Sequence, residues 1–161
     1  MIIRDEEEAD RAAIRDLVTA AFGQSDEADL VDWLRADGDS VISLVAVDED
    51  RIVGHVLFSR MKSALRALGM APVSVSPQRQ RSGIGSRLVR AGLERAAEEG
   101  WQAVFVVGEP DYYRRFGFDA ALAQGFSSPY SGPYLMAIAL DGQLPASTGK
   151  IEFAPAFARL G

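Results

Sequence analysis

The chain of 161 residues contains no cysteine and a single histidine, His55. Without thiols it has no disulfide, no thiolate nucleophile and no cysteine ligand for a metal ion. One imidazole is too few for the multi-histidine sites that commonly hold zinc, so we expect no metal. No apolar run approaches the about 20 residues that a membrane-spanning helix needs. The first ten residues, MIIRDEEEAD, are acidic where a secretory signal peptide is basic and then apolar. We therefore expect a cytoplasmic protein without a membrane partner.

Positive charge is also scarce in this sequence. Lys and Arg number 17 against 23 Asp and Glu, which gives a formal net charge of −6 and a pI of about 4.8. Nucleic-acid-binding proteins usually present a basic face, so we expect no nucleic-acid partner. An acidic protein instead raises the local concentration of cations such as protonated amines. The exception is a group of arginines around one glycine-containing loop: Arg79, Arg81, Arg87 and Arg90.

The rest of the composition is that of an ordinary globular protein, with 48% hydrophobic and 25% charged residues. The length suits one domain, so the sequence predicts a single domain over residues 1–161. Apolar periodicity predicts helices at residues 10–22, 27–34, 84–99 and 111–116, and strands at 1–4, 41–47, 51–58, 71–75, 101–107 and 134–140. We expect Gly100 to follow the end of the long helix and Asp111 to cap the short one. This order predicts an α/β (α+β) fold with one central sheet flanked by helices.

The most informative segment is VSVSPQRQRSGIGSRL, residues 73–88. A strand runs through a proline-containing turn into a loop that opens directly into the long helix. The free backbone N–H groups and positive dipole end of that helix favour binding of an anion such as a pyrophosphate. Gly83 and Gly85 have no Cβ atoms to keep a phosphate away from the backbone. The segment matches neither a Walker A loop nor a dinucleotide fingerprint, since Leu88 stands where the latter has its third small residue.

This segment resembles motif A of the GNAT acyl-CoA-dependent N-acetyltransferases, which reads Gln/Arg-x-x-Gly-x-Gly/Ala after a strand and a proline. A second match lies downstream at residues 111–118, DYYRRFGF. It looks like motif B of the same family, in which a tyrosine stands four residues before Gly-Phe. The sequence is most similar to a small single-domain bacterial branch with a Tyr-Tyr-x-Arg-Phe-Gly-Phe string. Two motifs in this order, separated by one helix and one strand, are more specific than either alone.

The resemblance implies a particular fold and a particular cosubstrate. We expect a GNAT-like central sheet, mixed but mostly antiparallel, in which strands 71–75 and 101–107 splay apart and admit the pantetheine arm of acetyl-CoA. The backbone groups that lose their ladder partners there must find others. By resemblance, the pantetheine contacts are Val73, Ser74 and Val75, and the pyrophosphate is held by Arg81, Ser82, Gly83, Ile84, Gly85 and Ser86.

The resemblance also implies a reaction in which an amine attacks the thioester directly in a ternary complex. Tyr113 occupies the family's tyrosine position and is expected to be the acid for the leaving thiolate. Tyr112 is the reserve candidate. Because neighbouring positions of a helix point about 100° apart, only one of the two tyrosines can face the sulfur. An alkyl amine is protonated at neutral pH and must lose a proton before attack. Glu109, His55 or water are the open alternatives for this base.

Several properties stay open at this stage. The acceptor is either a small-molecule amine or a protein amine, and the loop of residues 124–133 together with the early helices is expected to shape its site. A further alternative is transfer of an acyl group larger than acetyl, which the apolar bulk that Met61, Met70 or Phe58 brings to the cleft would decide. A homodimer through the C-terminal strand rests on analogy alone. The alternative function is a non-catalytic acyl-CoA-binding sensor, in which Tyr113 is a packing residue.

Overall fold

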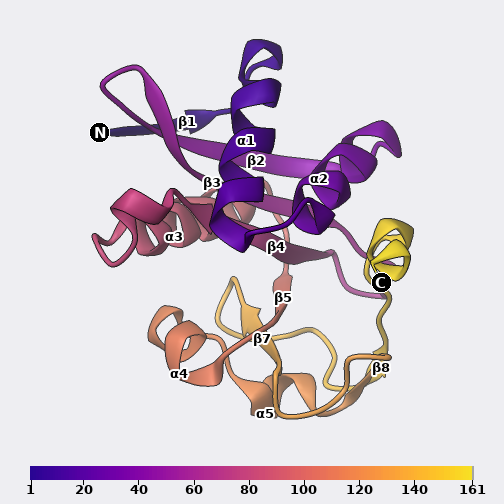
Figure 1. Ribbon diagram of the computed structural model, residues 1–161. Helices are drawn as coiled ribbons and strands as arrows, with labels where there is room; N and C mark the ends of the chain where they lie inside the picture. Colours follow the sequence, from indigo (N-terminus) through magenta and orange to yellow (C-terminus); the bar gives the residue numbers. More distant parts are fainter. Residues whose placement is uncertain (161) are drawn as a thin grey trace.

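A computed structural model describes residues 1–160 of the chain. Its main feature is a six-stranded sheet in the order β1-β2-β3-β4-β5-β7, in which only the β4–β5 pair is parallel (Figure 1). The strands are β1 (Ile2–Asp5), β2 (Ser40–Asp48), β3 (Arg51–Arg60), β4 (Ala67–Val75), β5 (Ala103–Val107) and β7 (Leu135–Ala139). Two short strands, β6 (Phe126–Ser127) and β8 (Gly149–Lys150), pair separately. The predicted mixed, mostly antiparallel sheet is confirmed.

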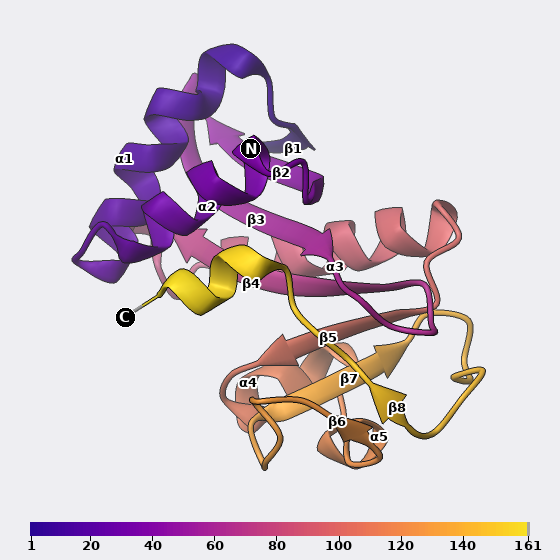
Figure 2. The same cartoon turned by 90° about the vertical axis from the view of Figure 1, so that its right-hand side faces the viewer.

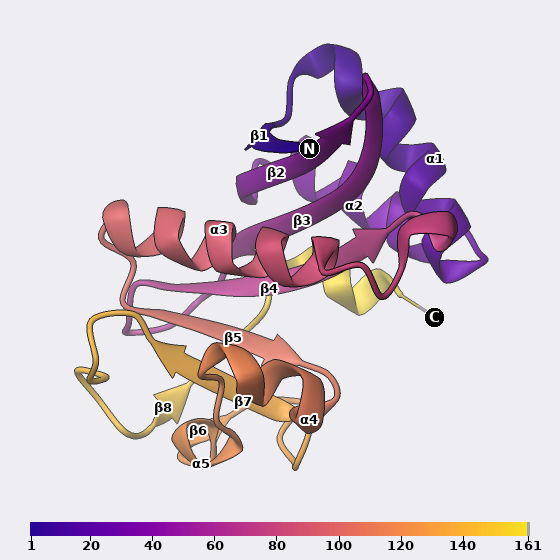
Figure 3. The same cartoon turned by 90° about the vertical axis from the view of Figure 1, so that its left-hand side faces the viewer.

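Helices cover both faces of this sheet. The longer ones are α1 (Arg11–Phe22), α2 (Asp26–Ala36) and α3 (Ile84–Glu98), and the short ones are α4 (Pro110–Tyr113) and α5 (Ala120–Ala123). Helices α1 and α2 lie on one face and α3 on the other (Figures 1 and 3). Within the described residues, no helix has the length and apolar character needed to cross a bilayer. The same residues contain no group of three or more His, Asp and Glu placed to hold a metal ion.

Helix α3 approaches the sheet closely because glycine stands at both sides of the contact. A Cβ atom on Gly92 would lie 2.2 Å from the Phe58 ring of β3, and one on Gly54 of β3 would lie 2.7 Å from Leu88 of α3. The hydrophobic side chains Ile84, Leu88 and Val89 point from the helix into this core. The contact fixes the helix, and with it the position of the helix N-terminus beside β4.

Strands β4 and β5 pair over only three residues each, Ala67 to Gly69 with Ala103 to Phe105, and then diverge toward their C-terminal ends (Figures 2 and 3). The pairing with β3 shows the cause. Between Met70 and Val73, β4 carries one more residue than β3, which is a bulge that bends the strand. Pro72 lies within it and has no N–H to donate to a neighbouring strand. The expected splayed pair is therefore present.

A few predicted element boundaries are wrong. Glu109, and not Asp111, is the N-cap residue of α4, because Pro110 occupies the first helical position, which suits its fixed φ and missing N–H. Strand β4 begins at Ala67, four residues before its predicted start, and β5 begins at Ala103 rather than at residue 101. The C-terminal segment, which the sequence left unassigned, ends in the 3-10 helix η4 (Pro155–Arg159), which lies beside α2 (Figure 2).

Candidate functional site

The loop before α3 forms one side of a cavity of about 220 Å³. The backbone of Arg81 and that of Gly83 are both in the left-handed region, with φ of 66° and 87°, which turns the chain sharply into the helix. The first hydrogen bond of the helix runs from the Arg87 amide to the Gly83 carbonyl at 3.1 Å. The amides of residues 84–86 therefore have no acceptor within the helix. The cavity is lined by Val75, Arg79, Gln80, Arg81, Gly83, Ile84, Gly85, Ser86, Tyr112 and Arg115.

Three arginines line this cavity, and none of its lining residues is acidic. Arg79 is bound to Asp48 at 2.6 Å, and Arg81 is exposed. The guanidinium of Arg115 lies 4.7 Å from the ring centre of Tyr112, which is one helical turn before it. Arg115 stands in the Tyr-Tyr-x-Arg-Phe-Gly-Phe string but was not predicted as a site residue, although its spacing of three residues from Tyr112 places both on one side of a helix. The cavity thus combines free amides with positive side chains, as an anion site requires.

Side chains of the loop hold its shape. The Gln80 amide donates to the Val75 carbonyl at 3.2 Å, and the Ser82 hydroxyl donates to the Arg79 carbonyl. Ser82 was predicted among the pyrophosphate contacts, but it is not one of the residues that line the cavity. Its hydroxyl group is hydrogen-bonded within the loop instead. The other five predicted pyrophosphate residues all line the cavity.

The free edge of β4 continues from this cavity toward β5. The Ser76 amide donates to the Val53 carbonyl of β3 at 2.9 Å, and Ser74 is the register partner of His55. Alternation along a strand then turns the backbone groups of Val73 and Val75 away from β3, into the gap. Ser74 differs from its two neighbours, because its side chain is 1% exposed and its hydroxyl has no hydrogen-bond partner among the described residues. Val73 and Val75 are therefore the residues that offer backbone groups at the gap.

The two tyrosines of α4 point into different cavities. A Cβ atom on Gly85 would lie 3.1 Å from the Tyr112 hydroxyl, so Tyr112 closes the loop cavity. The Tyr113 ring lies against Gly108, where a Cβ atom would be 2.5 Å away, and packs edge-on against Phe118. Tyr113 lines a second cavity of about 290 Å³ on the far side of the gap. Burial, with a smaller contribution from Tyr112, raises the pKa of Tyr113 to about 12, so its hydroxyl keeps its proton at neutral pH.

This second cavity lies between the β4 edge, the end of α1, the start of α2 and the C-terminal segment. Val73 lines it, whereas Val75 lines the loop cavity, so the two cavities follow one another along β4. Glu27 of α2 is the only charged residue among those that line it. Glu27 was not predicted as a site residue, because the α2 sequence pattern indicates only an amphipathic helix. The lining residues are Phe22, Glu27, Leu30, Met70, Ala71, Pro72, Val73, Val107, Tyr113, Phe157 and Leu160.

The two residues considered as bases lie elsewhere. Glu109 is exposed at the start of α4, where its carbonyl accepts hydrogen bonds from the Tyr112 and Tyr113 amides at 3.2 Å, and it lines neither cavity. His55 is fully buried, with Nε2 2.8 Å from the Ser43 hydroxyl. Burial lowers the pKa of His55 although Glu6 lies 3.8 Å away, so the imidazole is neutral at neutral pH. Neither side chain reaches the gap directly.

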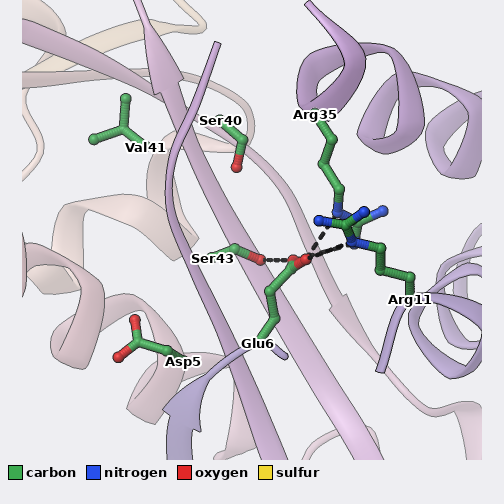
Figure 4. A pocket seen from close by; sticks show the side chains of 7 residues that line it. All are labelled: Asp5, Glu6, Arg11, Arg35, Ser40, Val41 and Ser43. Carbon is green, nitrogen blue, oxygen red and sulfur yellow. Dashed lines mark hydrogen bonds and ion pairs between the residues drawn. The ribbon is translucent and has the colours of Figure 1, made fainter. Parts of the chain in front are cut away.

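A third cavity of about 330 Å³ lies at the opposite edge of the sheet, between β1, β2 and α2 (Figure 4). Its centre is the Glu6 carboxylate, which accepts hydrogen bonds from Arg35 at 2.8 Å and from the Ser43 hydroxyl. Arg11 lies 3.8 Å from the same carboxylate. Burial opposes ionisation of Glu6, but the neighbouring His55 and the hydrogen bonds from Arg35 and Ser43 outweigh burial and lower the pKa of Glu6 to about 2. The charges of this cavity satisfy one another, so we assign it a structural role.

Comparison with known proteins agrees with this geometry. The family model described as "Acetyltransferase (GNAT) domain" matches residues 2–121. Two Escherichia coli K12 relatives are the uncharacterized N-acetyltransferases YjhQ, 40% identical over 79% of this chain and 75% of its own length, and YhbS, 33% identical over 99% of both chains.

Solved structures of similar proteins were determined with the cosubstrate or its product bound. E. coli YhbS in complex with CoA superposes with a TM-score of 0.92 at 34% identity, over 99% of this chain and 93% of that one. A Brucella melitensis GNAT family acetyltransferase in complex with acetyl-CoA gives a TM-score of 0.83 at 33% identity, over 97% of each chain. The chain therefore belongs to the GNAT family of acetyltransferases.

Proposed function

We propose that this acetyltransferase is one N-acyltransferase domain, residues 1–161, that moves the acetyl group of acetyl-CoA to a primary amine by direct attack in a ternary complex. The observation that carries the proposal is the succession of two cavities along the free edge of β4, one at the free N-terminus of α3 and one lined by Tyr113. The cytoplasmic location expected from the sequence is part of the same proposal.

The residues of the path fit the parts of the cosubstrate. The amides of residues 84–86, with Gly83, Arg81 and Arg115, suit the negatively charged pyrophosphate. The backbone groups of Val73 and Val75 suit the amide groups of a pantetheine arm, which can take the place of a neighbouring strand. Ser74 would then contribute only through its position in the strand. Similar proteins have been solved with CoA and acetyl-CoA bound, which supports acetyl-CoA as the cosubstrate.

In the chemical step, a free amide on the β4 edge stabilises the negative charge that develops on the thioester oxygen. Tyr113 donates its proton to the departing sulfur, for which its raised pKa keeps the proton available at neutral pH. The ammonium group of the acceptor first loses one proton, which Glu109 at the start of α4 is proposed to accept through water, since its side chain is exposed and lines neither cavity. As the C–N bond forms and the C–S bond breaks, the nitrogen loses a second proton, which replaces the one that Tyr113 gave to the sulfur.

Calorimetric titration with acetyl-CoA tests the binding site. We expect the wild type to bind, and Gly83→Glu to bind at least about tenfold more weakly, because the new carboxylate repels phosphate at the helix N-terminus. Gly100→Glu is the matched control, since Gly100 has a similar φ of 82°, equally open surroundings and a place at the other end of α3. Absence of binding to folded wild-type protein would overturn the proposal.

A thiol-release assay with a panel of amines tests the acid. We expect Tyr113→Phe to lower kcat by about 100-fold while acetyl-CoA affinity is kept, because only the donated proton is lost. Tyr112→Phe is the matched control, and we expect it to change acetyl-CoA affinity more than kcat. If the wild type binds acetyl-CoA but releases no thiol with any amine, the protein is a sensor instead of an enzyme.

A further inference from the structure

We propose that the acceptor is a primary amine carried on a single apolar body, such as an alkyl or aryl amine, and that Glu27 binds its ammonium group. This inference rests on the proposed function and names its substrate class. It is drawn from the walls of the cavity that Tyr113 lines.

That cavity is part of a longer apolar groove. A neighbouring cavity of about 130 Å³ shares five of its lining residues: Met70, Ala71, Val107, Phe157 and Leu160. The neighbouring cavity adds the rings of Tyr130 and Phe153. We call the two together the acceptor groove. Across both, Glu27 is the only charged side chain among the lining residues.

The walls of the acceptor groove select against polar molecules. A sugar hydroxyl or a second ammonium group placed against Met70, Val107 or Phe157 would lose its hydration without gaining a hydrogen-bond partner. An alkyl or aryl group placed there instead removes apolar surface from water on both sides. Phe22 and Val107 are 42% and 44% exposed, so they offer such surface to a ligand.

The charge of Glu27 favours an amine over an extended acyl chain as the occupant of the acceptor groove. Its half-buried carboxylate accepts hydrogen bonds from the Gln24 side-chain amide at 3.1 Å to Oε1 and 3.4 Å to Oε2, which leaves further acceptor positions free. An ammonium group can pair with this carboxylate, whereas an acyl chain has no charge and would only bring apolar surface near it. One carboxylate also matches one ammonium group, and a polyamine would leave a second charge without a partner.

Part of the apolar wall comes from residues that follow the match to the family model. Tyr130, Phe153, Phe157 and Leu160 all follow residue 121, where the match to the family model ends. The rings are held in place edge-on, Tyr130 against Phe153 at 5.4 Å and Phe153 against Phe157 at 5.5 Å. Arg159 of η4 donates a hydrogen bond to Asp37, the residue that follows α2, at 3.2 Å. The helix η4 lies beside α2 (Figure 2). The groove is therefore preformed by this chain's own C-terminal segment.

The test compares two primary amines of equal length in the thiol-release assay with acetyl-CoA, hexylamine and 2-(2-aminoethoxy)ethanol. We expect kcat/KM to be at least about tenfold higher for hexylamine, since an apolar pocket discriminates by this factor or more. Glu27→Gln should raise the KM for hexylamine about fivefold with kcat kept, as expected for loss of a half-exposed ion pair. Glu94→Gln, on the exposed side of α3, is the matched control and should leave both constants unchanged.

A second variant tests the wall. Phe157→Ala should lower kcat/KM for hexylamine about tenfold and leave the constants for 2-(2-aminoethoxy)ethanol and the affinity for acetyl-CoA unchanged, and Phe157→Leu should restore most of the loss. Equal or faster turnover of the polar amine would overturn the inference. So would a preference for hexanoyl-CoA over acetyl-CoA that Phe157→Ala removes, because the groove would then hold the acyl chain. Acetyl-CoA binding without turnover of any amine would instead refute the proposed function itself.

Discussion

At the scale of single residues, the sequence identified the chemical groups better than their surroundings. Its only histidine was one of three alternatives for the base, but the structure buries it completely on the α1 and α2 side of the sheet. Burial of one residue depends on contacts with distant segments, which a local pattern does not contain. The same reason explains why Glu27 and Arg115 were missed, since each becomes notable only through what lies opposite to it.

The buried histidine makes stability depend on pH. His55 is enclosed together with Glu6, and Arg35 lies on the other side of that carboxylate. Burial lowers the pKa of His55 in the folded state, with Arg35 adding to that effect and Glu6 opposing it. Below about pH 6.5 the unfolded chain binds a proton that the folded chain resists. Stability is therefore full above this pH and is lost as the pH falls from there toward the folded-state pKa.

We expect the free energy of unfolding to fall between pH 7 and pH 5, with a slope of at most about 1.4 kcal/mol per pH unit. Because the chain has one histidine, His55→Gln should flatten the slope in this window while its amide still reaches the Ser43 hydroxyl. Urea unfolding at pH 5, 6 and 7 measures both proteins. An equally steep slope in the variant would show that another group titrates there.

At the scale of elements, prediction succeeded where a local pattern decides the structure. The start of α3 and the glycine loop before it were predicted from sequence, because helix periodicity and glycine placement are local signals. The first residues of β4 were missed, since the segment that begins at Ala67 is defined by its partners on β3 and β5 rather than by alternation. The bulge at Pro72 is likewise visible only once the register with β3 is known.

The close packing of α3 against the sheet gives a prediction at this scale. In an isolated helix, Gly92→Ala would stabilise the helical conformation by about 1 kcal/mol. Here the new Cβ would lie 2.2 Å from the Phe58 ring, which is fully buried. We expect a net loss of about 1–3 kcal/mol in the free energy of unfolding, as for other overpacked cores.

Urea denaturation of Gly92→Ala, Phe58→Leu and the double variant measures this contact. The smaller leucine should relieve the clash, so the double variant should lose less than the sum of the single losses. Strict additivity, or a Gly92→Ala protein as stable as the wild type, would mean that α3 can move away from the sheet. In that case the position of its N-terminus beside β4 would be less firmly set than we infer.

At the scale of the whole molecule, charge is distributed in a way that net charge alone does not predict. The protein carries −6 overall, so it should repel a phosphate-rich ligand such as acetyl-CoA. The loop cavity, however, is lined by Arg79, Arg81 and Arg115 with no acidic residue, whereas the acceptor groove has one carboxylate and no basic residue. The two ends of the β4 path therefore have opposite charge, in keeping with an anionic cosubstrate and a cationic acceptor.

The salt dependence of acetyl-CoA binding distinguishes an effect of the charges at the cavity from an effect of the net charge of the protein. The Debye length falls from about 14 Å at 0.05 M to about 4 Å at 0.5 M salt, which screens distant charges first. If net charge dominated, added salt would tighten acetyl-CoA binding; since the arginines lie at the cavity itself, we expect added salt to weaken it.

The variant Arg115→Gln should raise the Kd for acetyl-CoA and reduce this salt dependence. Arg114→Gln is the matched control, because Arg114 is exposed, lies near Asp111 and does not line the cavity. Calorimetry at the two salt concentrations measures all three proteins, and tighter binding of the wild type at high salt would contradict the assignment of the arginines to the pyrophosphate.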